Sequence, residues 1–396
     1  LWPRYSISDD DTVYSSRKEF CEEEWVDFAS NDYLGFSRSD LNSQSREEVD
    51  KRIGGASGSR ILSGNSSAAE KLESTIAAFH GFPYALLCNS GFDANVAILS
   101  CIPADVVIYD EYVHASMHDG IRLSRAKHRL KFSHNSVSSL RSALQNCANL
   151  VPSSDRAPAI LVVVESMYSM QGDVCPLKKV LAEVEIHQAM LIVDEAHSVG
   201  IHGPQGQGLL YARNLHKHPN VLASVVTYGK AFGAHGAALL LKSSTAFNYF
   251  LNYARPIIFS TSLPPSGINR LQLVYNHMSG SDAGHRRARL AVLSDYFDFR
   301  RSSYKHKLDW LPSFGSGPIK CVVISGNELC TMVADRLRTF NFMVYPVRAP
   351  TVPSGSERIR IVLHSFNTAK QIGELLDVLY DTMEAQSVSV VPCAKL

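Results

Sequence analysis

The sequence lacks the features of several large classes of protein. No apolar run approaches the roughly eighteen residues needed to cross a bilayer, and the start at Leu1 resembles neither a signal peptide nor a transit peptide. The 8 cysteines show no C-x-x-C pair and no metal-ligand spacing. The 39 basic residues are balanced by 38 acidic ones, so no excess charge attracts nucleic acid or a membrane surface. We therefore expect an intracellular protein with reduced thiols and no metal.

Phosphate-binding glycine motifs are also missing. The glycine-rich stretch 54–60 does not follow a strand-like run and contains neither G-x-G-x-x-G nor G-K-[ST], which argues against a Rossmann fingerprint and a P-loop. It is interpreted as a loop of close backbone approach. The run Ser67-Ala68-Ala69-Glu70 has the form of a capping box and predicts a helix from there to His80, ended by Gly81.

What is present is an alternation of apolar runs and helix-length segments, typical of a mostly parallel sheet covered by helices on both faces. The strand-like runs are Tyr84 to Cys88, Asp105 to Tyr109, Ala159 to Val164, Met190 to Val193 and Val221 to Val226. In such α/β sheets, ligands bind beyond the carboxyl ends of the strands. The residues that follow each run are therefore the candidate site.

Polar residues follow four of these runs. They are Asn89 to Asn95, where a Gly turn enters a helix suited to phosphate, then Asp110 to His114, Glu165 to Ser169, and Asp194 with His197. The fifth run is followed by Thr227-Tyr228-Gly229-Lys230, a lysine in a turn of small residues. All of these groups are expected to meet at one edge of the sheet.

A lysine placed in this way, with an aspartate at the end of the preceding strand, is what an enzyme needs to hold pyridoxal phosphate (PLP) as a Schiff base. Lys230 would form the imine, and Asp194 would keep the pyridine nitrogen protonated. His197 would bond the phenolic oxygen, Thr227 the phosphate, and the His114 ring would stack on the cofactor. Taken singly, the lysine could be an ordinary surface residue, the aspartate a helix cap and the histidine structural.

The chain resembles the α-oxoamine synthases, PLP enzymes of fold type I, over nearly its whole length and in the right order. The matching segments are 30–35, 58–60, 90–92, 114–116, 165–173, 194–200 and 227–230. The resemblance implies a large domain with a seven-stranded, mostly parallel sheet and a smaller C-terminal α+β domain. It also implies decarboxylative condensation of an amino acid with an acyl-CoA in a homodimer with shared active sites. Segments 233–238 and 255–265 favour L-alanine and pimeloyl-CoA, and Gly236-Ala237-Ala238 stands where relatives that use glycine or serine usually have Gly-Gly-Tyr.

The resemblance also implies roles for individual residues. The catalytic set is Lys230, His114, Asp194 and His197, and the cofactor-binding set adds Ser90, Gly91, Phe92, Ser169, Thr227, and Thr261 from the second subunit. The substrate-binding set is Arg4, Asn31, Ser169, Arg348 and Thr351. One departure is Ala69, where relatives often have His, which bears only on local packing near the glycine-rich loop.

The resulting domain prediction has four parts. They are an arm at 1–45, the PLP-binding domain at 46–266, the small domain at 267–386 and a tail at 387–396. In the small domain we expect strands at 319–324 and 358–363 and a last amphipathic helix that ends near Ala385. The basic stretch 286–289 is interpreted as a solvated helix face, with the phosphates of coenzyme A as the alternative.

Two alternative functions and the cellular location remain open at this stage. The chain could be a related enzyme that uses glycine or serine with another acyl-CoA, or a cofactor-free homologous subunit, which would be expected to have lost Lys230. The ending Ala394-Lys395-Leu396 differs by one small residue from a peroxisomal Ser-Lys-Leu signal and predicts recognition by the peroxisomal import receptor, with a cytoplasmic location as the alternative.

Overall fold

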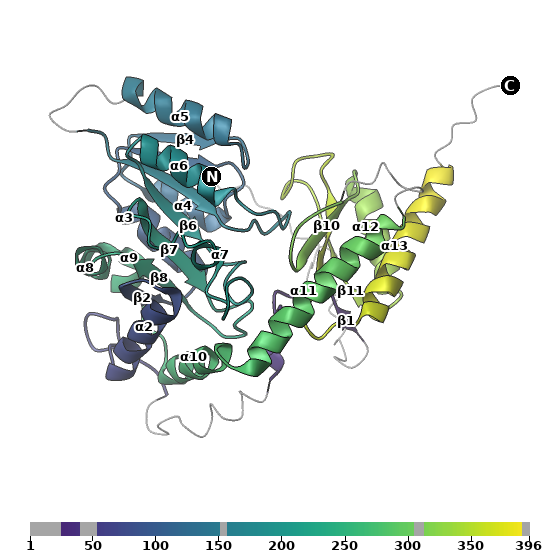
Figure 1. The fold of residues 1–396 in the computed structure, drawn as a ribbon, viewed down its shortest axis with the longest axis horizontal. Helices are drawn as coiled ribbons and strands as arrows, with labels where there is room; N and C mark the ends of the chain where they lie inside the picture. The colour runs from purple at the N-terminus through teal and green to yellow at the C-terminus, as the bar shows by residue number, and fades with distance from the viewer. Residues whose placement is uncertain (1–24, 40–53, 151–156, 305–312, 390–396) are drawn as a thin grey trace, which may run out of the picture.

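The computed structural model describes residues 25–39, 54–150, 157–304 and 313–389. In Figure 1 they form a larger layered part and a smaller part, and both are in contact with the helix α11 (Ser281–Ser302). Within the described ranges, no helix is both long and apolar enough to cross a membrane. Arg4, most of the predicted arm and the signal at 394–396 lie outside them.

The larger part is built on a seven-stranded sheet, as predicted. Its order is β2 (Tyr84–Cys88), β8 (Ala237–Leu241), β7 (Val221–Thr227), β6 (Met190–Asp194), β5 (Ile160–Glu165), β3 (Val106–Asp110) and β4 (His128–Phe132). Only β8 runs antiparallel to its neighbours. The inner strand β5 is buried along its whole length, which explains its continuous run of Val, Leu and Ile.

Helices cover both faces of this sheet, and each face has its own apolar cluster. One cluster includes residues of α3 (Gly91–Cys101), α4 (Ala115–Leu123), α8 (Ser244–Tyr253) and α9 (Arg255–Ile258). The other includes α2 (Ser67–His80), α5 (Val137–Leu150), α6 (Leu177–Ile186), α7 (Leu209–Ala212) and α10 (Pro265–Met278). Because both faces of the sheet are covered by apolar residues, the polar residues gather at the carboxyl ends of the parallel strands.

The start of α2 differs from the prediction by one residue. The cap is Ser66, whose hydroxyl accepts a hydrogen bond from the Ala69 amide at 3.2 Å, and Ser67 is the first helical residue. The end was predicted correctly, because Gly81 closes the helix with a left-handed φ of 72°. Glu70 is bonded by the side chain of Asn65 at 2.7 Å and so does not reach back to the cap.

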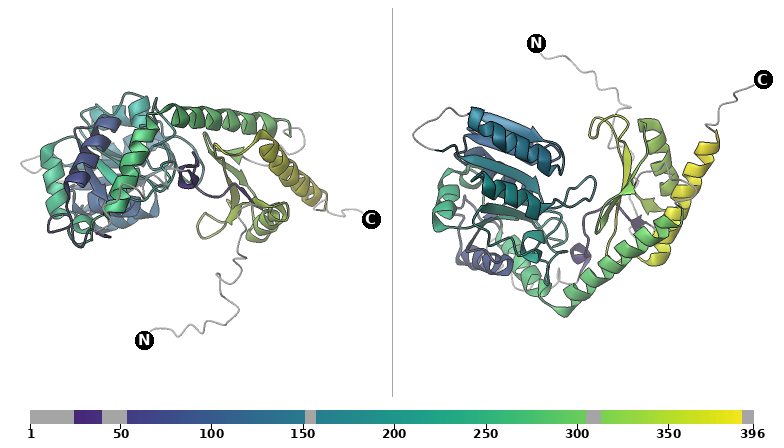
Figure 2. Two further views of the ribbon diagram at one scale, coloured as in Figure 1. Left: turned by 90° about the horizontal axis from the view of Figure 1, so that it is seen from below. Right: turned by 45° about the horizontal axis from the view of Figure 1, so that its top comes forward.

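The smaller part is a four-stranded antiparallel sheet backed by helices (Figure 2). The strand order is β12 (Tyr345–Val347), β13 (Arg358–Val362), β10 (Ile319–Val323) and β9 (Ser313–Phe314), and the helices are α12 (Asn327–Arg338) and α13 (Ala369–Ser389). The apolar stripe predicted for the last helix is confirmed, since its five members are fully buried: Ile372, Leu375, Leu376, Leu379 and Met383. The helix runs to Ser389, beyond the expected end near Ala385.

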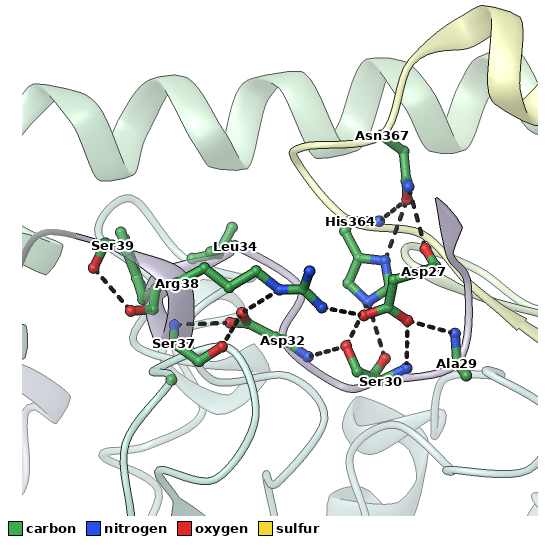
Figure 3. A network of polar contacts seen from close by, with 12 residues as sticks. Asp27, Ala29, Ser30, Asp32, Leu34, Ser37, Arg38, Ser39, His364 and Asn367 are labelled. Atoms are coloured by element: carbon green, nitrogen blue, oxygen red, sulfur yellow. Dashed lines mark hydrogen bonds and ion pairs between the residues drawn. The ribbon is translucent and has the colours of Figure 1, made fainter. Parts of the chain in front are cut away.

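Residues 25–39, here called the bridging segment, contact both parts. Its strand β1 (Val26–Asp27) pairs with β11 (Phe342–Met343), and the short helix η1 (Phe36–Arg38) lies near its end. Figure 3 shows Asp27 between Arg38, with which it is ion-paired at 2.7 Å, and the ring of His364. On the other side, Arg270 of α10 donates to the Phe36 carbonyl at 2.8 Å. Both parts therefore hold the stretch between β1 and η1, which carries Asn31 and Tyr33.

The basic stretch on α11 is half-buried to exposed, as a solvated face would be, but its arginines also bond to other segments of the chain. Arg286 donates to the Leu34 carbonyl at 2.9 Å, Arg287 to the Pro204 carbonyl at 3.2 Å, and Arg289 to the Asn367 carbonyl at 2.9 Å. Each guanidinium satisfies a carbonyl oxygen of a different segment. These arginines join the two parts of the chain.

Candidate active site

The lysine lies in a turn between β7 and β8. Tyr228 and Gly236 close the turn through a backbone hydrogen bond of 2.9 Å, and Gly233 takes a left-handed φ of 55° that suits glycine. The Lys230 amine lies 2.8 Å from Nε2 of His197. Burial lowers the pKa of Lys230 to about 8, although Asp194 and Glu165 favour its charged form. The amine can therefore lose or gain a proton near neutral pH.

Asp194 ends β6 and is held by two donors. One of its carboxylate oxygens accepts the Ala196 amide at 2.8 Å, and the other accepts the side-chain amide of Asn95 at 2.8 Å. Asn95 also donates to the hydroxyl of Ser116 at 3.0 Å, and that hydroxyl lies 2.7 Å from Nδ1 of His114. A hydrogen-bonded row through the buried Asn95 and Ser116 thus connects the carboxylate with the imidazole predicted to stack on the cofactor.

Asn95 was not among the predicted site residues. The stretch 89–95 was interpreted only as a phosphate turn, but Asn95 lies one helical turn beyond Gly91, on α3, and is buried. A polar residue at that spacing in an otherwise apolar helix is the signal that could have identified it. His114 is the N-cap of α4, and burial lowers its pKa against the attraction of Asp194.

His197 and Tyr33 come together from distant parts of the chain. The Tyr33 hydroxyl lies 2.7 Å from Nδ1 of His197, and both side chains are buried. Burial lowers the pKa of His197 well below its ordinary value, and the positive charges of Lys230 and Arg360 lower it further. The imidazole is therefore neutral, so each ring nitrogen is either a donor or an acceptor. In the sequence analysis Tyr33 entered only as part of the matching segment 30–35 and was given no role of its own.

Arg360 of β13 also lies at this site. It donates to the Ser169 carbonyl at 2.7 Å and to the side-chain oxygen of Asn31 at 2.9 Å. The structure does not bring Arg348 and Thr351 to Asn31, because both are exposed and Arg348 donates to Thr331 of α12 at 3.3 Å. Of the predicted substrate-binding residues, Asn31 and Ser169 are together. The missed Arg360 stands where the resemblance had suggested Arg348.

The start of α3 forms the phosphate end of the site. Ser90 caps the helix by accepting the Asp93 amide at 3.0 Å, and the amides that follow have no partner within the helix. A Cβ on Gly91 would lie 3.3 Å from the side chain of Thr227, so the loop and the end of β7 approach closely. Thr261 is exposed, and its carbonyl accepts the Asn89 side chain at 2.8 Å. Phe92 is also exposed.

Sequence comparison identifies the family. Residues 23–379 match the aminotransferase class I and II family. The chain belongs to this family, whose members depend on PLP. It is 34% identical to 8-amino-7-oxononanoate synthase of Emericella nidulans, over 89% of this chain and 88% of that protein. It is 35% identical to the synthase of the same name from Enterobacter sp. (strain 638), over 90% of this chain and 89% of that protein.

Solved structures of PLP enzymes share the fold. A variant of serine palmitoyltransferase from S. paucimobilis, solved with PLP and myriocin bound, is 28% identical with a TM-score of 0.82, over 92% of this chain and 88% of that one. The 8-amino-7-oxononanoate synthase of Francisella tularensis is 28% identical with a TM-score of 0.75, over 92% of this chain and 99% of that one. The prediction of fold type I is therefore confirmed.

The site residues fit PLP. The amine of Lys230, the buried carboxylate of Asp194 and the imidazole of His114 lie close together and are linked by hydrogen bonds. The first amides of α3 are free to bind an anion, and Thr227 lies close to Gly91 at this helix start. A side chain at position 91 would fill part of that space. When bound, PLP supplies an electron sink for negative charge at the Cα of an amino acid.

Glu165 is a further buried acid at this PLP site. It ends β5 directly beside Asp194 in the sheet register, and one of its carboxyl oxygens is buried without a hydrogen-bond partner. Burial raises the pKa of Glu165 well above its ordinary value, and the negative charge of Asp194 raises it further. The environment of Glu165 therefore disfavours its charged form.

A second ionic cluster consists of His134, Asp110 and Asp173. His134 is bonded to Asp110 at 2.9 Å and to Asp173 at 2.6 Å, and its ring stacks on Tyr112. Burial opposes its charge, but the two carboxylates dominate and raise the pKa of His134 to about 9. A protonated His134 thus links Asp110, at the end of β3, with Asp173, in the loop that follows Ser169.

This cluster gives the stability a pH dependence. The folded-state pKa of His134 is raised above the ordinary value, so its contribution is fully present below about pH 6.5 and is lost as pH rises through about 9. Within that window its share of the free energy of unfolding should fall by about 1.4 kcal/mol per pH unit. Urea titrations at several pH values should show this slope in the wild type and its loss in His134→Gln. Equal slopes in the two proteins would contradict the assignment.

Proposed function

We propose that the protein is an 8-amino-7-oxononanoate synthase, which condenses L-alanine with pimeloyl-CoA and releases CO2 and coenzyme A. The supporting observation is the match at 34–35% identity to enzymes of this name over about nine tenths of both chains. The product is a precursor of biotin, so the proposal also gives the protein a place in biotin biosynthesis.

The residues of the site account for the steps that a protein must assist. Arg360 and Asn31 offer the donors that hold the carboxylate of the amino acid, a charge-assisted contact near the reacting carbon. Lys230, with its pKa of about 8, is suited to remove the Cα proton once it is free. When PLP is bound, Asp194 would pair with its ring nitrogen and His114 would cover the ring.

The closest competing function is condensation of serine or glycine with another acyl-CoA. The serine palmitoyltransferase structure favours it, with a TM-score of 0.82 against 0.75 for the synthase from Francisella tularensis at the same identity. Against it stand Ala237 and Ala238, which are fully buried in β8. A tyrosine at position 238, as in the usual pattern of glycine and serine users, would need repacking of the sheet face.

A panel of amino acids and acyl-CoAs distinguishes these functions. The enzyme is loaded with PLP and offered L-alanine, L-serine or glycine with pimeloyl-CoA, palmitoyl-CoA or acetyl-CoA, and thiol release is followed. We expect the highest kcat/KM for alanine with pimeloyl-CoA. A higher value for serine or glycine would replace the proposal with the competing function.

Arg360 and Arg348 can be compared directly as carboxylate-binding residues. Losing one charged hydrogen bond costs about 1.5–3 kcal/mol, so Arg360→Lys should lower kcat/KM for alanine by about 10- to 100-fold. Arg348→Lys, a matched change on the exposed surface, should stay within about twofold of the wild type. The reverse order would mean that the small part moves to bring Arg348 to the substrate.

We further propose a homodimer in which Thr261 of one chain completes the phosphate site of the other. The exposed side chain of Thr261, next to the start of α3, supports this. Lys230→Ala and Thr261→Asp chains, each inactive alone, should regain activity when co-expressed, because one hybrid site then has both native residues. Hybrids without activity would count against shared sites.

The location of the enzyme is a separate proposal. Ala394-Lys395-Leu396 is proposed as a peroxisomal signal that the import receptor reads at a free end. A fluorescent protein joined ahead of the full chain should collect in peroxisomes, and the same fusion without these three residues should stay diffuse. Identical distributions of the two fusions would rule out this signal.

A further inference from the structure

Four polar groups form a row that ends at the reactive lysine. The side-chain oxygen of Asn31 lies 3.2 Å from the Tyr33 hydroxyl, which lies 2.7 Å from Nδ1 of His197, and Nε2 of His197 lies 2.8 Å from the amine of Lys230. Tyr33 is fully buried, and His197 is nearly so. Because water does not reach these two side chains, their hydrogen bonds must be satisfied within the row and by Arg360, whose side chain also bonds to Tyr33.

The row has one complete set of hydrogen bonds when Lys230 is charged. An ammonium group has only donors, so Nε2 of His197 must accept. The imidazole is neutral, so its single proton is then on Nδ1 and is donated to the Tyr33 oxygen. Tyr33 in turn donates its own proton to the side-chain oxygen of Asn31.

A second complete set exists when Lys230 is uncharged. Its amine can now accept, so His197 carries its proton on Nε2 and Nδ1 accepts from the Tyr33 hydroxyl. The side-chain oxygen of Asn31 still accepts a hydrogen bond in this set, because Arg360 donates to it at 2.9 Å. A phenol can donate or accept, whereas phenylalanine at position 33 would leave the Nδ1 side without a partner in either set.

We propose that Tyr33 is a positioning residue that lets His197 exchange its tautomer when Lys230 gains or loses a proton. In going from charged to uncharged lysine, one proton passes from the amine to Nε2. The Nδ1 proton passes to the Tyr33 oxygen, and the former hydroxyl proton leaves to solvent at the half-buried Asn31 end of the row. One proton leaves the row in total. The proposal does not depend on which amino acid or acyl-CoA the enzyme uses.

The surrounding charges are compatible with both sets. Asp194 on β6 and Glu165 on β5 favour the charged lysine, and Arg360 on β13 opposes it. Arg360 and His114 also act against a charge on His197, which keeps the imidazole neutral throughout. Burial raises the pKa of Tyr33 to about 12, so the phenol keeps its proton while the lysine titrates.

The test uses the full chain freed of PLP and shown to regain activity when PLP is returned. The histidines are labelled with nitrogen-15, and two-dimensional NMR reports which ring nitrogen of His197 carries the proton between pH 6 and pH 10. The signal is assigned by its loss in His197→Gln. In the wild type we expect Nδ1–H at low pH and Nε2–H at high pH, with a midpoint near the pKa of about 8 for Lys230.

Tyr33→Phe should remove the partner of Nδ1–H and so disfavour the charged lysine. Its midpoint should move down by at least about one pH unit, or the Nε2–H tautomer should persist over the whole range. Tyr380→Phe, which removes a buried phenol of the small part, should titrate as the wild type does. A wild-type His197 with one tautomer at every pH, or a Tyr33→Phe midpoint equal to the wild type, would overturn the proposal.

Discussion

Lys230→Ala should lower kcat by at least about 10³-fold while the protein remains folded. The variant loses both the amine that attaches PLP and the base that removes the Cα proton. Stability should be unchanged or slightly higher, because a buried amine costs desolvation energy that alanine does not. Thiol release measures the activity, and circular dichroism with urea titration measures the fold.

Lys242→Ala is the matched control for this prediction. Lys242 follows β8 and donates to the His216 carbonyl, away from the site residues described above. Its removal should leave kcat within about twofold of the wild type. If Lys230→Ala kept the wild-type rate, the assignment of Lys230 as the PLP-binding lysine would be wrong.

Asp194→Asn should lower kcat by about 10²- to 10³-fold and weaken PLP binding. The wild-type carboxylate accepts from Ala196 and from Asn95, two donors on its two oxygens. An amide of the same shape turns its own NH2 toward one of these donors and also removes the charge that keeps the ring nitrogen protonated. Steady-state kinetics and PLP titration followed by absorbance measure the two effects.

Asp298→Asn serves as the control for the aspartate. Asp298 is partly exposed and accepts from Lys320 at 2.6 Å in the small part of the chain. It should keep normal kcat and normal PLP affinity. Normal kinetics in Asp194→Asn would show that another group protonates the ring.

The sequence predicted the parts of the fold that have a strong local pattern. The five apolar runs became five strands of the sheet, each within a residue of its predicted ends. The strands β4 and β8 were not recognised from their pattern. β4, with the sequence His-Arg-Leu-Lys-Phe, is a half-exposed edge strand, and β8 begins with two alanines, which have low strand propensity.

The site was predictable where function follows a strand end, and less so where distant segments meet. Lys230, Asp194, His197 and His114 follow strands of one sheet, so their convergence follows from topology. The contacts of Tyr33 with His197 and of Asn31 with Arg360 join residues 164 and 329 positions apart. No local pattern encodes such pairs, and Arg348 was therefore chosen over Arg360 by resemblance.

The most direct test of the proposed reaction follows one carbon atom. The PLP-loaded enzyme is given pimeloyl-CoA and L-alanine labelled with carbon-13 in its carboxyl group. We predict that labelled CO2 and free coenzyme A appear in equal amounts, together with unlabelled 8-amino-7-oxononanoate. Pyruvate that retains the label, formed without release of coenzyme A, would show amino-group transfer instead and would contradict the proposed condensation.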